Sequence, residues 1–555
     1  MKKNIMLALM AAWFAMPQAE AQKTKRKSKT VALPAEKVEA PAAAAEPTAE
    51  TFAQTITAAD LSAHLHVLAS DEYEGRETGK KGQKMAAEYI ANHFRENEIP
   101  SPATLDNPYY QTFELEESRW EKASLKVGKS DFVFLKDFYL PGDEPTENTQ
   151  QLDLVFAGYG IETEKHSDYH NLDVNGKTVV ILNGEPKDAK GNFLVSGSKK
   201  PSAWNSDYRS KLKLAREKGA KNLIIISDQT DQQFQKQVEY LRHRLEKPRL
   251  DFPAEKQPGG KTPVVFVSQS VGAAILNSDA KKLQAFKTQV SKAGKPVAAK
   301  FKPVKNAMLS AEKTHTPVAT ENVLGFVEGS DKKDEIIVIT AHYDHVGMDP
   351  DLKGDQIFNG ADDDGSGTSA VLELAQAFME AKKAGSGPRR SILFMTVTAE
   401  EKGLLGSEYY TNNPVYPLQN TVANLNIDMI GRLDKKYAED KNYVYVIGSD
   451  KLSSELHKIN EEANQKHTHL QLDYTYNDED DPNRFYYRSD HYNFAKNNIP
   501  VAFYFNGVHE DYHQPGDEVE KILFDKMETI TRLVFYTAWE IANRDERIKV
   551  DSNKR

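Results

Sequence analysis

Side chains that suit divalent metal ions recur through the C-terminal half of this sequence, each in a short polar motif beside an apolar run. Zinc accepts imidazole nitrogens and carboxylate oxygens as ligands, and a further carboxylate beside them could move a proton. This is the inventory that a two-metal hydrolytic site needs. The residues that would supply it are His342, Asp362, Glu400, Glu401, Asp428 and His513.

The first motif is His342-Tyr343-Asp344, which directly follows the apolar run 336–340. In open α/β sheets, ligands bind beyond the carboxyl ends of the strands. His342 is therefore a predicted metal ligand, and Asp344 is placed to orient its ring through the second ring nitrogen. Taken alone, the motif fits a buried histidine with a hydrogen-bonded partner better. The adjacent His345 receives no predicted role.

The second motif, residues 359–367, is a glycine-bounded loop with three consecutive aspartates, and it opens a helical pattern. Three adjacent carboxylates repel one another unless cations neutralise them. A carboxylate can also bridge two ions, which an imidazole cannot, and Asp362 is the candidate for that role. The alternative for such a loop is an ordinary helix cap and turn.

The third motif places Glu400 and Glu401 just after the apolar run 392–398. Neighbouring side chains at a strand end point in different directions. One glutamate could therefore bind a metal ion while the other faces the reacting water. A solvated charge pair at a loop is the alternative interpretation.

Two further candidates complete the set. Asp428 closes the apolar run 422–427, where a carboxylate needs a partner to offset its desolvation. His513 lies in a turn after the apolar run 500–505, and Asp517 is near enough in sequence to support it.

The elements that must position these side chains alternate between strands and helices from about residue 322 onward. Such alternation argues for an α/β sheet covered on both faces. Four of the five motifs then lie at strand ends of one sheet, and the acidic loop opens a helix between two of them. Strands are predicted at 323–327, 336–340, 392–398, 422–428, 443–447 and 500–505, and helices at 368–382, 451–465 and 519–542.

A separate unit is predicted at about 151–290. Short apolar strands recur in it, with a helix over 211–218, and the very polar run 232–261 is interpreted as a long exposed insertion. The strands are predicted at 154–156, 179–182, 223–226 and 264–267. Ahead of this unit, the apolar spacing over 81–94 predicts a helix.

The first residues have the three parts of a secretory signal: a basic start, a short apolar run and an Ala-x-Ala cleavage site ending at Ala21. A buried N-terminal helix is the alternative. Residues 22–52 are mostly Ala, Pro, Glu and Lys, which predicts a disordered linker. We therefore expect export to the periplasm or the extracellular space.

The composition is that of a soluble globular protein, with 39% hydrophobic and 28% charged residues in 555. A net charge of −10 makes the chain a poor candidate for nucleic-acid binding. The absence of cysteine excludes disulfides and thiolate metal ligands. No membrane span is expected after the N-terminal segment.

In its five motifs the sequence resembles the secreted dizinc aminopeptidase family, whose relatives include glutamate carboxypeptidase and the non-catalytic transferrin receptor. The resemblance covers about 322–541, and residues 65–94 resemble the family's N-terminal segment, so the peptidase domain would be split. It implies the zinc-exopeptidase fold, with a mixed, mostly parallel central sheet flanked by helices. The matching residues are His342-Tyr343-Asp344, 360–363, Glu400-Glu401, 426–431 and Tyr512-His513.

The resemblance also implies a role for each candidate and a cis peptide bond after the bridging aspartate, which would be Asp362-Asp363. By this resemblance, His342 and Asp428 would hold one zinc ion, Glu401 and His513 the other, Asp362 would bridge them, Glu400 would be the general base, and Asp344 would stand behind His342.

Residues 151–290 resemble the protease-associated domain that is often inserted in this family, a smaller β-rich α/β unit. The implied organisation has seven parts. They are a signal peptide at 1–21, a linker at 22–52, the first part of the peptidase domain at 53–150, the inserted domain at 151–290, a return linker at 291–321, the catalytic part at 322–545, and a tail at 546–555.

The predicted function is that of a secreted exopeptidase with two Zn²⁺ ions, most directly an aminopeptidase that acts on peptides. A carboxypeptidase or dipeptidase of the same fold, a single-zinc glutaminyl cyclase, and a non-catalytic binding protein are alternatives. A carboxypeptidase needs arginines for the substrate carboxylate, and the acidic run 478–481 is a weak candidate for calcium. The candidate arginines are Arg76, Arg432, Arg484 and Arg488.

Overall fold

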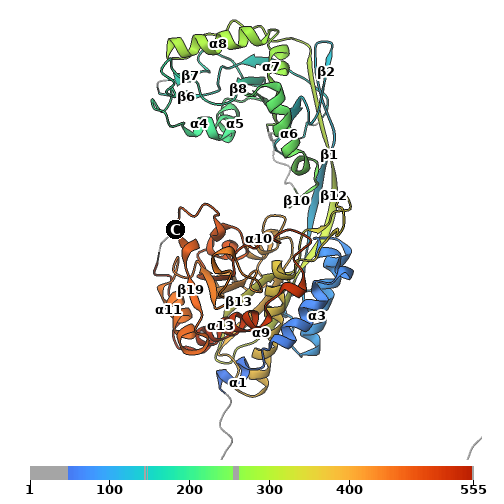
Figure 1. The fold of residues 1–555 in the computed structure, drawn as a ribbon, viewed down its shortest axis with the longest axis vertical. Coiled ribbons are helices and arrows are strands. Elements are labelled where there is room, and N and C mark those ends of the chain that lie inside the picture. Colours follow the sequence, from blue (N-terminus) through green and yellow to red (C-terminus); the bar gives the residue numbers. More distant parts are fainter. Residues whose placement is uncertain (1–47, 143–144, 147, 165, 254–261, 553–555) are drawn as a thin grey trace, which may run out of the picture. The chain divides into compact units, whose positions relative to one another are not determined.

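The computed structural model describes residues 48–142, 145–146, 148–164, 166–253 and 262–552 (Figure 1). The predicted signal peptide lies outside these residues, as does most of the predicted linker. The linker prediction runs too far, because helix α1 (Ala49–Ala53) already buries Phe52 against the core. Within the described part of the chain, no helix has the length and apolar character needed to cross a membrane.

The larger sheet has eleven strands and is mixed. At its centre, β16, β13, β17 and β20 are parallel neighbours, and antiparallel strands flank them. The predicted fold class is therefore confirmed. The strands in spatial order are β10 (Arg249–Asp251), β1 (Tyr110–Val127), β12 (Ala307–Val327), β16 (Arg390–Val397), β13 (Lys332–His342), β17 (Thr421–Ile427), β20 (Val501–Phe505), β18 (Tyr443–Ile447) and β19 (Gln471–Asp473), with β2 (Ser130–Val133) beside β1 and β4 (Gln150–Gln151) beside β12.

Helices cover both faces of this sheet, because its central strands are apolar on both sides. One face packs against α2, α3, α9, α11 and α13 (Figure 1), and the other packs against the shorter α10 and α12. The helices are α2 (Ala58–Leu68), α3 (Lys81–Glu96), α9 (Gly367–Lys383), α10 (Leu405–Asn412), α11 (Ser454–Ala463), α12 (His491–Ala495) and α13 (Phe524–Asn543).

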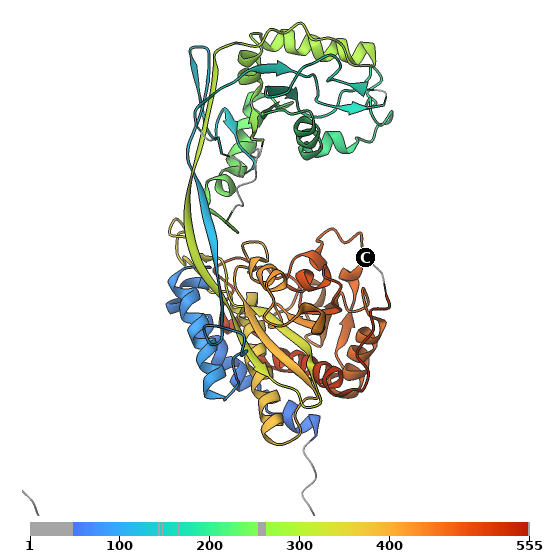
Figure 2. The same cartoon turned by 180° about the vertical axis from the view of Figure 1, so that it is seen from behind.

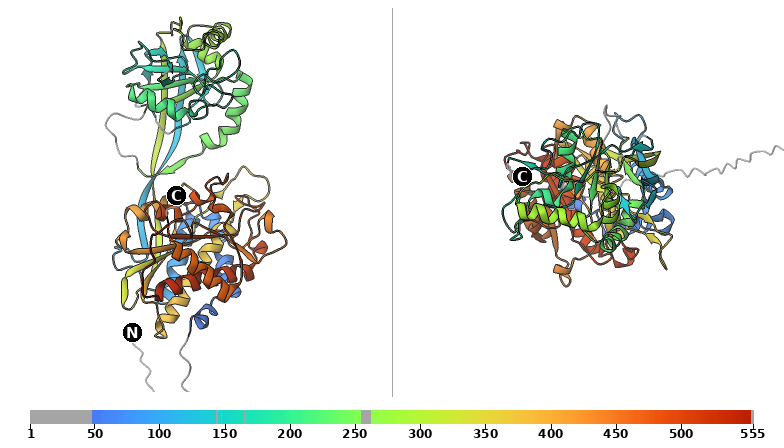
Figure 3. Two further views of the ribbon diagram at one scale, coloured as in Figure 1. Left: turned by 90° about the vertical axis from the view of Figure 1, so that its left-hand side faces the viewer. Right: turned by 90° about the horizontal axis from the view of Figure 1, so that it is seen from above.

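Strands β1 and β12 form a long antiparallel ribbon, with Tyr110 opposite Val323 at one end and Val127 opposite Ala307 at the other (Figures 2 and 3). The predicted return linker 291–321 therefore contains much of β12. The middle of this strand is exposed on both faces, so it lacks the apolar run by which buried strands are recognised.

The smaller sheet has five strands, parallel except at β3, with α5 (Tyr208–Glu217) on one face and α7 (Gln269–Ile275) and α8 (Ala280–Ala293) on the other. All four predicted strands are present in it. Their observed bounds, with β3, are β3 (Phe138–Tyr139), β11 (Val264–Val267), β9 (Asn222–Ile226), β8 (Thr178–Leu182) and β5 (Leu154–Phe156).

The described part of the predicted insertion 232–261, residues 232–253, is not the exposed segment that its polarity suggests. Its first part forms α6 (Asp231–Glu246), which buries Phe234 and Val238 on one face, and β10 then pairs with β1. A narrow apolar stripe at helical spacing marks this helix, and the many polar side chains around the stripe concealed it; the stripe is Phe234, Val238, Leu241 and Leu245. Two hairpins complete the strands, β6 (Glu162–Thr163) with β7 (His166–Ser167), and β14 (Gly347–Met348) with β15 (Ile357–Phe358).

Helices α2 and α9, which pack on the larger sheet, enclose a buried titratable pair. The two residues are His64 of α2 and Glu373 of α9. The His64 Nε2 atom is 3.2 Å from Glu373 Oε1, and its Nδ1 atom is 2.7 Å from the Tyr89 hydroxyl. Burial raises the pKa of Glu373 to about 8 and lowers the pKa of His64 to about 4. The folded pair therefore holds one proton at neutral pH.

This pair should make the protein less stable as the pH rises above neutrality. The unfolded side chains have pKa values of 4.5 and 6.5, so between pH 6.5 and pH 8 the folded state keeps a proton that the unfolded chain releases. The free energy of unfolding should fall by up to about 2 kcal/mol across this window. In Glu373→Gln this contribution should vanish. Denaturant titrations at several pH values measure it, and equal slopes in both proteins would contradict the assignment.

Candidate metal centre

The predicted ligands meet at one edge of the larger sheet. His342 ends β13, Asp428 follows β17, and Glu400 and Glu401 follow β16. His513 lies in the loop after β20. Because these four strands are parallel neighbours, their carboxyl ends lie at the same edge, as the sequence predicts.

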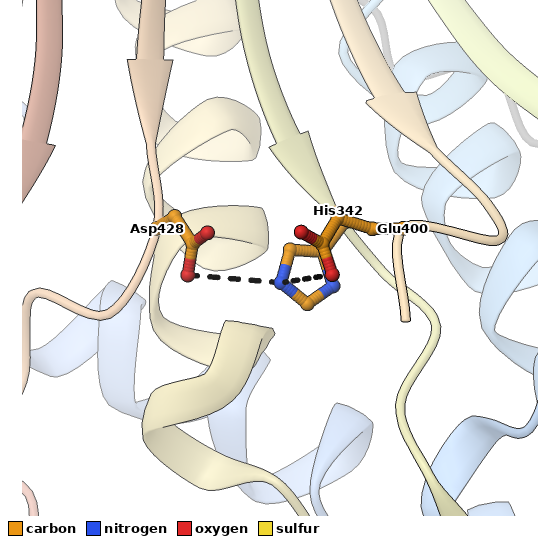
Figure 4. A group of neighbouring side chains, drawn as sticks. All are labelled: His342, Glu400 and Asp428. Carbon is orange, nitrogen blue, oxygen red and sulfur yellow. Dashed lines mark ion pairs between the residues drawn. The ribbon is translucent and has the colours of Figure 1, made fainter. Parts of the chain in front are cut away.

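One group of side chains surrounds the imidazole of His342. Its Nε2 atom lies 3.6 Å from Asp428 Oδ1, 3.9 Å from Glu400 Oε2 and 3.2 Å from Asp363 Oδ1. Figure 4 shows how His342, Glu400 and Asp428 point toward one another from three neighbouring strands. All of these side chains are buried or nearly so.

A second group lies on the other side of Asp363. Asp363 Oδ2 is 3.0 Å from His513 Nε2, which is 3.2 Å from Glu401 Oε1. His345 Nδ1 is also 2.8 Å from Glu401 Oε1. Asp363 thus presents one oxygen to each group, which is the arrangement of a carboxylate that bridges two sites.

The predicted bridging residue is therefore wrong by one position, because Asp362 points away from both groups. Its Oδ1 atom accepts a hydrogen bond from the Gly431 backbone at 2.6 Å, and its Oδ2 atom lies 3.3 Å from His509 Nε2. Asp363 takes the predicted place. The cis peptide bond likewise lies at Asp363–Asp364 rather than at Asp362–Asp363.

The three carboxylates of the acidic loop have different partners, because the backbone turns them in different directions. Asp364 accepts hydrogen bonds from the backbones of His342, Gly367 and Met429, at 3.1, 2.9 and 3.1 Å. The Asp517 carboxylate, predicted to support His513, accepts instead from the backbone N–H groups of Asp362 and Asp363, at 3.0 and 3.1 Å. Two carboxylates thus fix the loop, and Asp363 is left facing the two groups.

The donor set and its spacing fit zinc. Zinc binds His nitrogen and carboxylate oxygen at about 2.0–2.2 Å in a tetrahedron, which places neighbouring ligand atoms about 3.4 Å apart. The spacings of 3.0–3.6 Å within the two groups agree with this. Asp363 Oδ2 and Glu401 Oε1 are also buried, with imidazole nitrogens 2.8–3.2 Å away in directions that do not suit a hydrogen bond, as expected of atoms that would face an ion.

The electrostatics of the centre also favour cations. Four carboxylates, those of Asp363, Glu400, Glu401 and Asp428, lie around the imidazoles. Burial lowers the pKa of His513, yet the adjacent Asp363 and Glu401 raise it on balance to about 10. Burial raises the pKa of Glu400 well above its ordinary value. Positive charge is therefore stabilised at this edge of the sheet.

Asp344 has a different neighbour from the predicted one. The Nδ1 atom of His342 lies 3.0 Å from the backbone carbonyl of Asp344, whereas the carboxylate is 3.9 Å away. That carboxylate accepts hydrogen bonds from the Glu400 backbone at 3.1 Å and from the Thr78 hydroxyl at 2.8 Å. The backbone of Asp344 thus orients the histidine, and its side chain positions Glu400.

His345, which received no predicted role, lies inside the second group. Its side chain is fully buried, and a Cβ at Gly360 would stand 2.5 Å from its ring, so the ring occupies a close-fitting site. Its nearest polar atom in the group is Glu401 Oε1. The sequence signal was the spacing His342-x-x-His345, which places a second imidazole beside a strand end.

We expect His345 to support zinc binding through Glu401. Because partners of ligating carboxylates typically change metal affinity by about 10- to 100-fold, His345→Phe should weaken binding of the ion at Glu401 by that factor. His345→Asn, which keeps an N–H donor, should lose less. Titration with a competing chelator measures both, and equal affinities in His345→Phe and the unmodified protein would refute this role.

Two of the candidate arginines are already committed to the fold. Arg76 is fully buried and donates to the backbone carbonyls of Tyr343, Asn359 and Gly360, at 2.8, 2.6 and 2.9 Å. Arg432 donates to Asp511 at 2.8 Å. Arg76 thereby ties the N-terminal part of the chain to the loops on either side of the centre.

In the acidic run 478–481, the candidate calcium site, the Asp481 carboxylate accepts hydrogen bonds from nearby backbone N–H groups.

Comparisons with known proteins agree with this architecture. Residues 322–538 match the sequence model of Peptidase family M28, and residues 150–275 match that of the PA domain. Aminopeptidase YwaD of Bacillus subtilis is 28% identical over 245 residues, which are 43% of this chain and 48% of that protein. A probable leucine aminopeptidase of Trichophyton verrucosum is 31% identical over 218 residues, 38% of this chain and 55% of the relative.

The chain thus spans about half the length of these two relatives. Among solved structures, the aminopeptidase from Aneurinibacillus sp. strain AM-1 superposes with a TM-score of 0.52 at 19% identity, covering 90% of this chain and 98% of that one, which shows a shared fold. The predicted family and the inserted domain are confirmed. Residues 322–538 thus carry a sequence of the Peptidase family M28 type, and residues 150–275 form a PA domain inserted into the same peptidase fold.

Proposed function

We propose that this protein is a zinc-dependent aminopeptidase that binds two zinc ions and releases N-terminal residues from peptides. The observation that carries the proposal is the position of Asp363, which presents one oxygen to each of two ligand groups, with Glu400 beside the first. The match of residues 322–538 to Peptidase family M28 and the aminopeptidase names of the relatives support it.

In this proposal, His342, Asp428 and Asp363 would hold one ion, and Asp363, Glu401 and His513 would hold the second. Such ions, when bound, act as Lewis acids and lower the pKa of a water molecule. Glu400 would accept a proton from the attacking water and deliver it to the leaving amine. Asp344 holds the Glu400 backbone in place for both transfers.

Tyr512 is placed to stabilise the developing negative charge. Its ring stacks on His513 with centroids 4.0 Å apart, and its side chain lines the pocket beside the centre. Burial raises its pKa well above the ordinary value, so the phenol keeps its proton and can donate a hydrogen bond to the carbonyl oxygen of the scissile bond.

Chelation followed by zinc return tests the proposal. Removal of zinc should abolish hydrolysis of leucine anilide, and two zinc equivalents per chain should restore it. The N-acetylated anilide should resist cleavage, because an aminopeptidase requires the free amine. Full activity with a single equivalent would contradict the two-ion count. Equal cleavage of the blocked substrate would contradict aminopeptidase action.

Two alternative functions predict different results in these assays. A carboxypeptidase or dipeptidase would depend on a free C-terminal carboxylate in the substrate and would not cleave an anilide, which lacks one. A binding protein of the transferrin-receptor kind would show no turnover with zinc present.

We also propose that the protein is exported, on the basis of its signal-like N-terminal sequence.

A further inference from the structure

A pocket opens beside the metal centre and has two chemically different walls. One wall is the centre itself, and the other is largely apolar, with one hydroxyl and one guanidinium. Its lining residues outside the centre are Met429, Phe485, Arg488, Phe503, Phe505, Val508 and Tyr512. Apart from the histidines, Arg488 is the only basic side chain in this lining.

The guanidinium of Arg488 is held in place from two sides. Its Cζ atom lies 5.0 Å from the centroid of the Phe485 ring, and one of its nitrogens donates to the Tyr512 hydroxyl at 3.3 Å. Tyr512 in turn stacks on His513. Two successive contacts therefore connect this exposed cation to the metal centre.

The other N–H donors of Arg488 are not paired with a carboxylate of the described residues. Among the residues that the structure describes, no carboxylate forms an ion pair with it, whereas Arg432 is paired with Asp511. A guanidinium has five N–H donors in a fork that matches a carboxylate. Arg484, four residues earlier, stacks on Tyr487 and does not line the pocket.

From this geometry, and on the basis of the proposed function, we propose that Arg488 binds a carboxylate of the substrate. The preferred substrates are then short peptides that carry a carboxylate next to the scissile bond. That group is either the free C-terminus of a dipeptide or the side chain of an acidic residue. The apolar wall formed by Met429, Phe503 and Phe505 accommodates the hydrocarbon part of the same residue.

The test uses pairs of substrates that differ only in the carboxylate, with the zinc-loaded full-length protein. Leucyl-glycine and leucyl-glycinamide probe the C-terminus, and the p-nitroanilides of glutamate and glutamine probe the side chain. The measured quantity is the ratio of kcat/KM between the acid and its neutral partner. The variants are Arg488→Met, which keeps the stem over Phe485, Arg488→Lys, and the control Arg484→Met.

The unmodified protein should favour the acid in one of the two pairs. Arg488→Met should lower that ratio about 10- to 100-fold, the usual effect of losing charge-assisted hydrogen bonds. Arg488→Lys should lower it less, and Arg484→Met should leave it unchanged. The pair that responds identifies the source of the carboxylate. An unchanged ratio in both pairs for Arg488→Met would overturn the proposal.

A binding measurement separates this inference from the proposed function. Calorimetry of leucyl-glycine and its amide, and of glutamate and glutamine, with zinc-loaded Glu400→Gln and Glu400→Gln/Arg488→Met needs no turnover. Preferential binding of an acid that disappears with Arg488→Met supports the site even if no peptide is hydrolysed. Equal binding of acid and amide by both variants overturns it.

Discussion

Replacing Glu400 with glutamine is expected to abolish most turnover while zinc remains bound. The carboxylate lies beside His342 and Asp428 but farther from His342 Nε2 than Asp363 is, at 3.9 Å against 3.2 Å. A positioned general base contributes about 100- to 10,000-fold to the rate. The kcat of Glu400→Gln should be lower than that of the unmodified protein by a factor in this range. Glutamine keeps the shape of the side chain but cannot accept the proton.

The control for this experiment is Glu401→Gln, which changes the adjacent residue in the same way. Glu401 lies in the second group, so its replacement should reduce the zinc content, which Glu400→Gln should preserve. Metal analysis and steady-state kinetics of both variants measure the difference. Turnover of Glu400→Gln near that of the unmodified protein would exclude Glu400 as the base.

Replacing Asp363 with asparagine should cost the protein at least one of its two zinc ions. An amide offers one neutral oxygen where the carboxylate offers two charged ones, and the two oxygens of Asp363 face the two ligand groups. Lewis-acid catalysis supplies several kcal/mol, so activity should fall about 1,000-fold or more.

Asp362→Asn is the matched control, because it makes the same chemical change one residue away. An asparagine there still accepts the hydrogen bond from Gly431, and it loses only its charge beside His509. Both ions should remain. Metal content and thermal unfolding of the two variants distinguish the roles, and the reverse pattern would return the bridging role to Asp362.

The central strands were predictable because they are buried on both faces. Such strands are continuous apolar runs, and those of β13, β16, β17 and β20 end in polar motifs. Parallel order then brings these ends to one edge, so the meeting of His342, Glu401, Asp428 and His513 followed from pattern alone. Their roles as ligands stay predictions.

Elements with mixed exposure were not predictable in this way. The middle of the β1–β12 ribbon and the helix α6 have few buried residues, and the contacts that stabilise them come from distant parts of the chain. The pairing of β10 with β1, for example, joins residues 249–251 to residues 116–118. No local spacing encodes such a contact.

The sequence by itself determined the types of ligand, their order, and the sheet edge where they meet, because hydrophobic periodicity is a local property. The tertiary structure alone decided which of three consecutive aspartates faces the metal centre, since Gly431 and His509 draw Asp362 away while Asp517 and Asp364 fix the loop. It also decided that Arg488, and not the three other candidate arginines, lines the pocket beside the centre. Identical side chains differ only in the partners that folding brings to them.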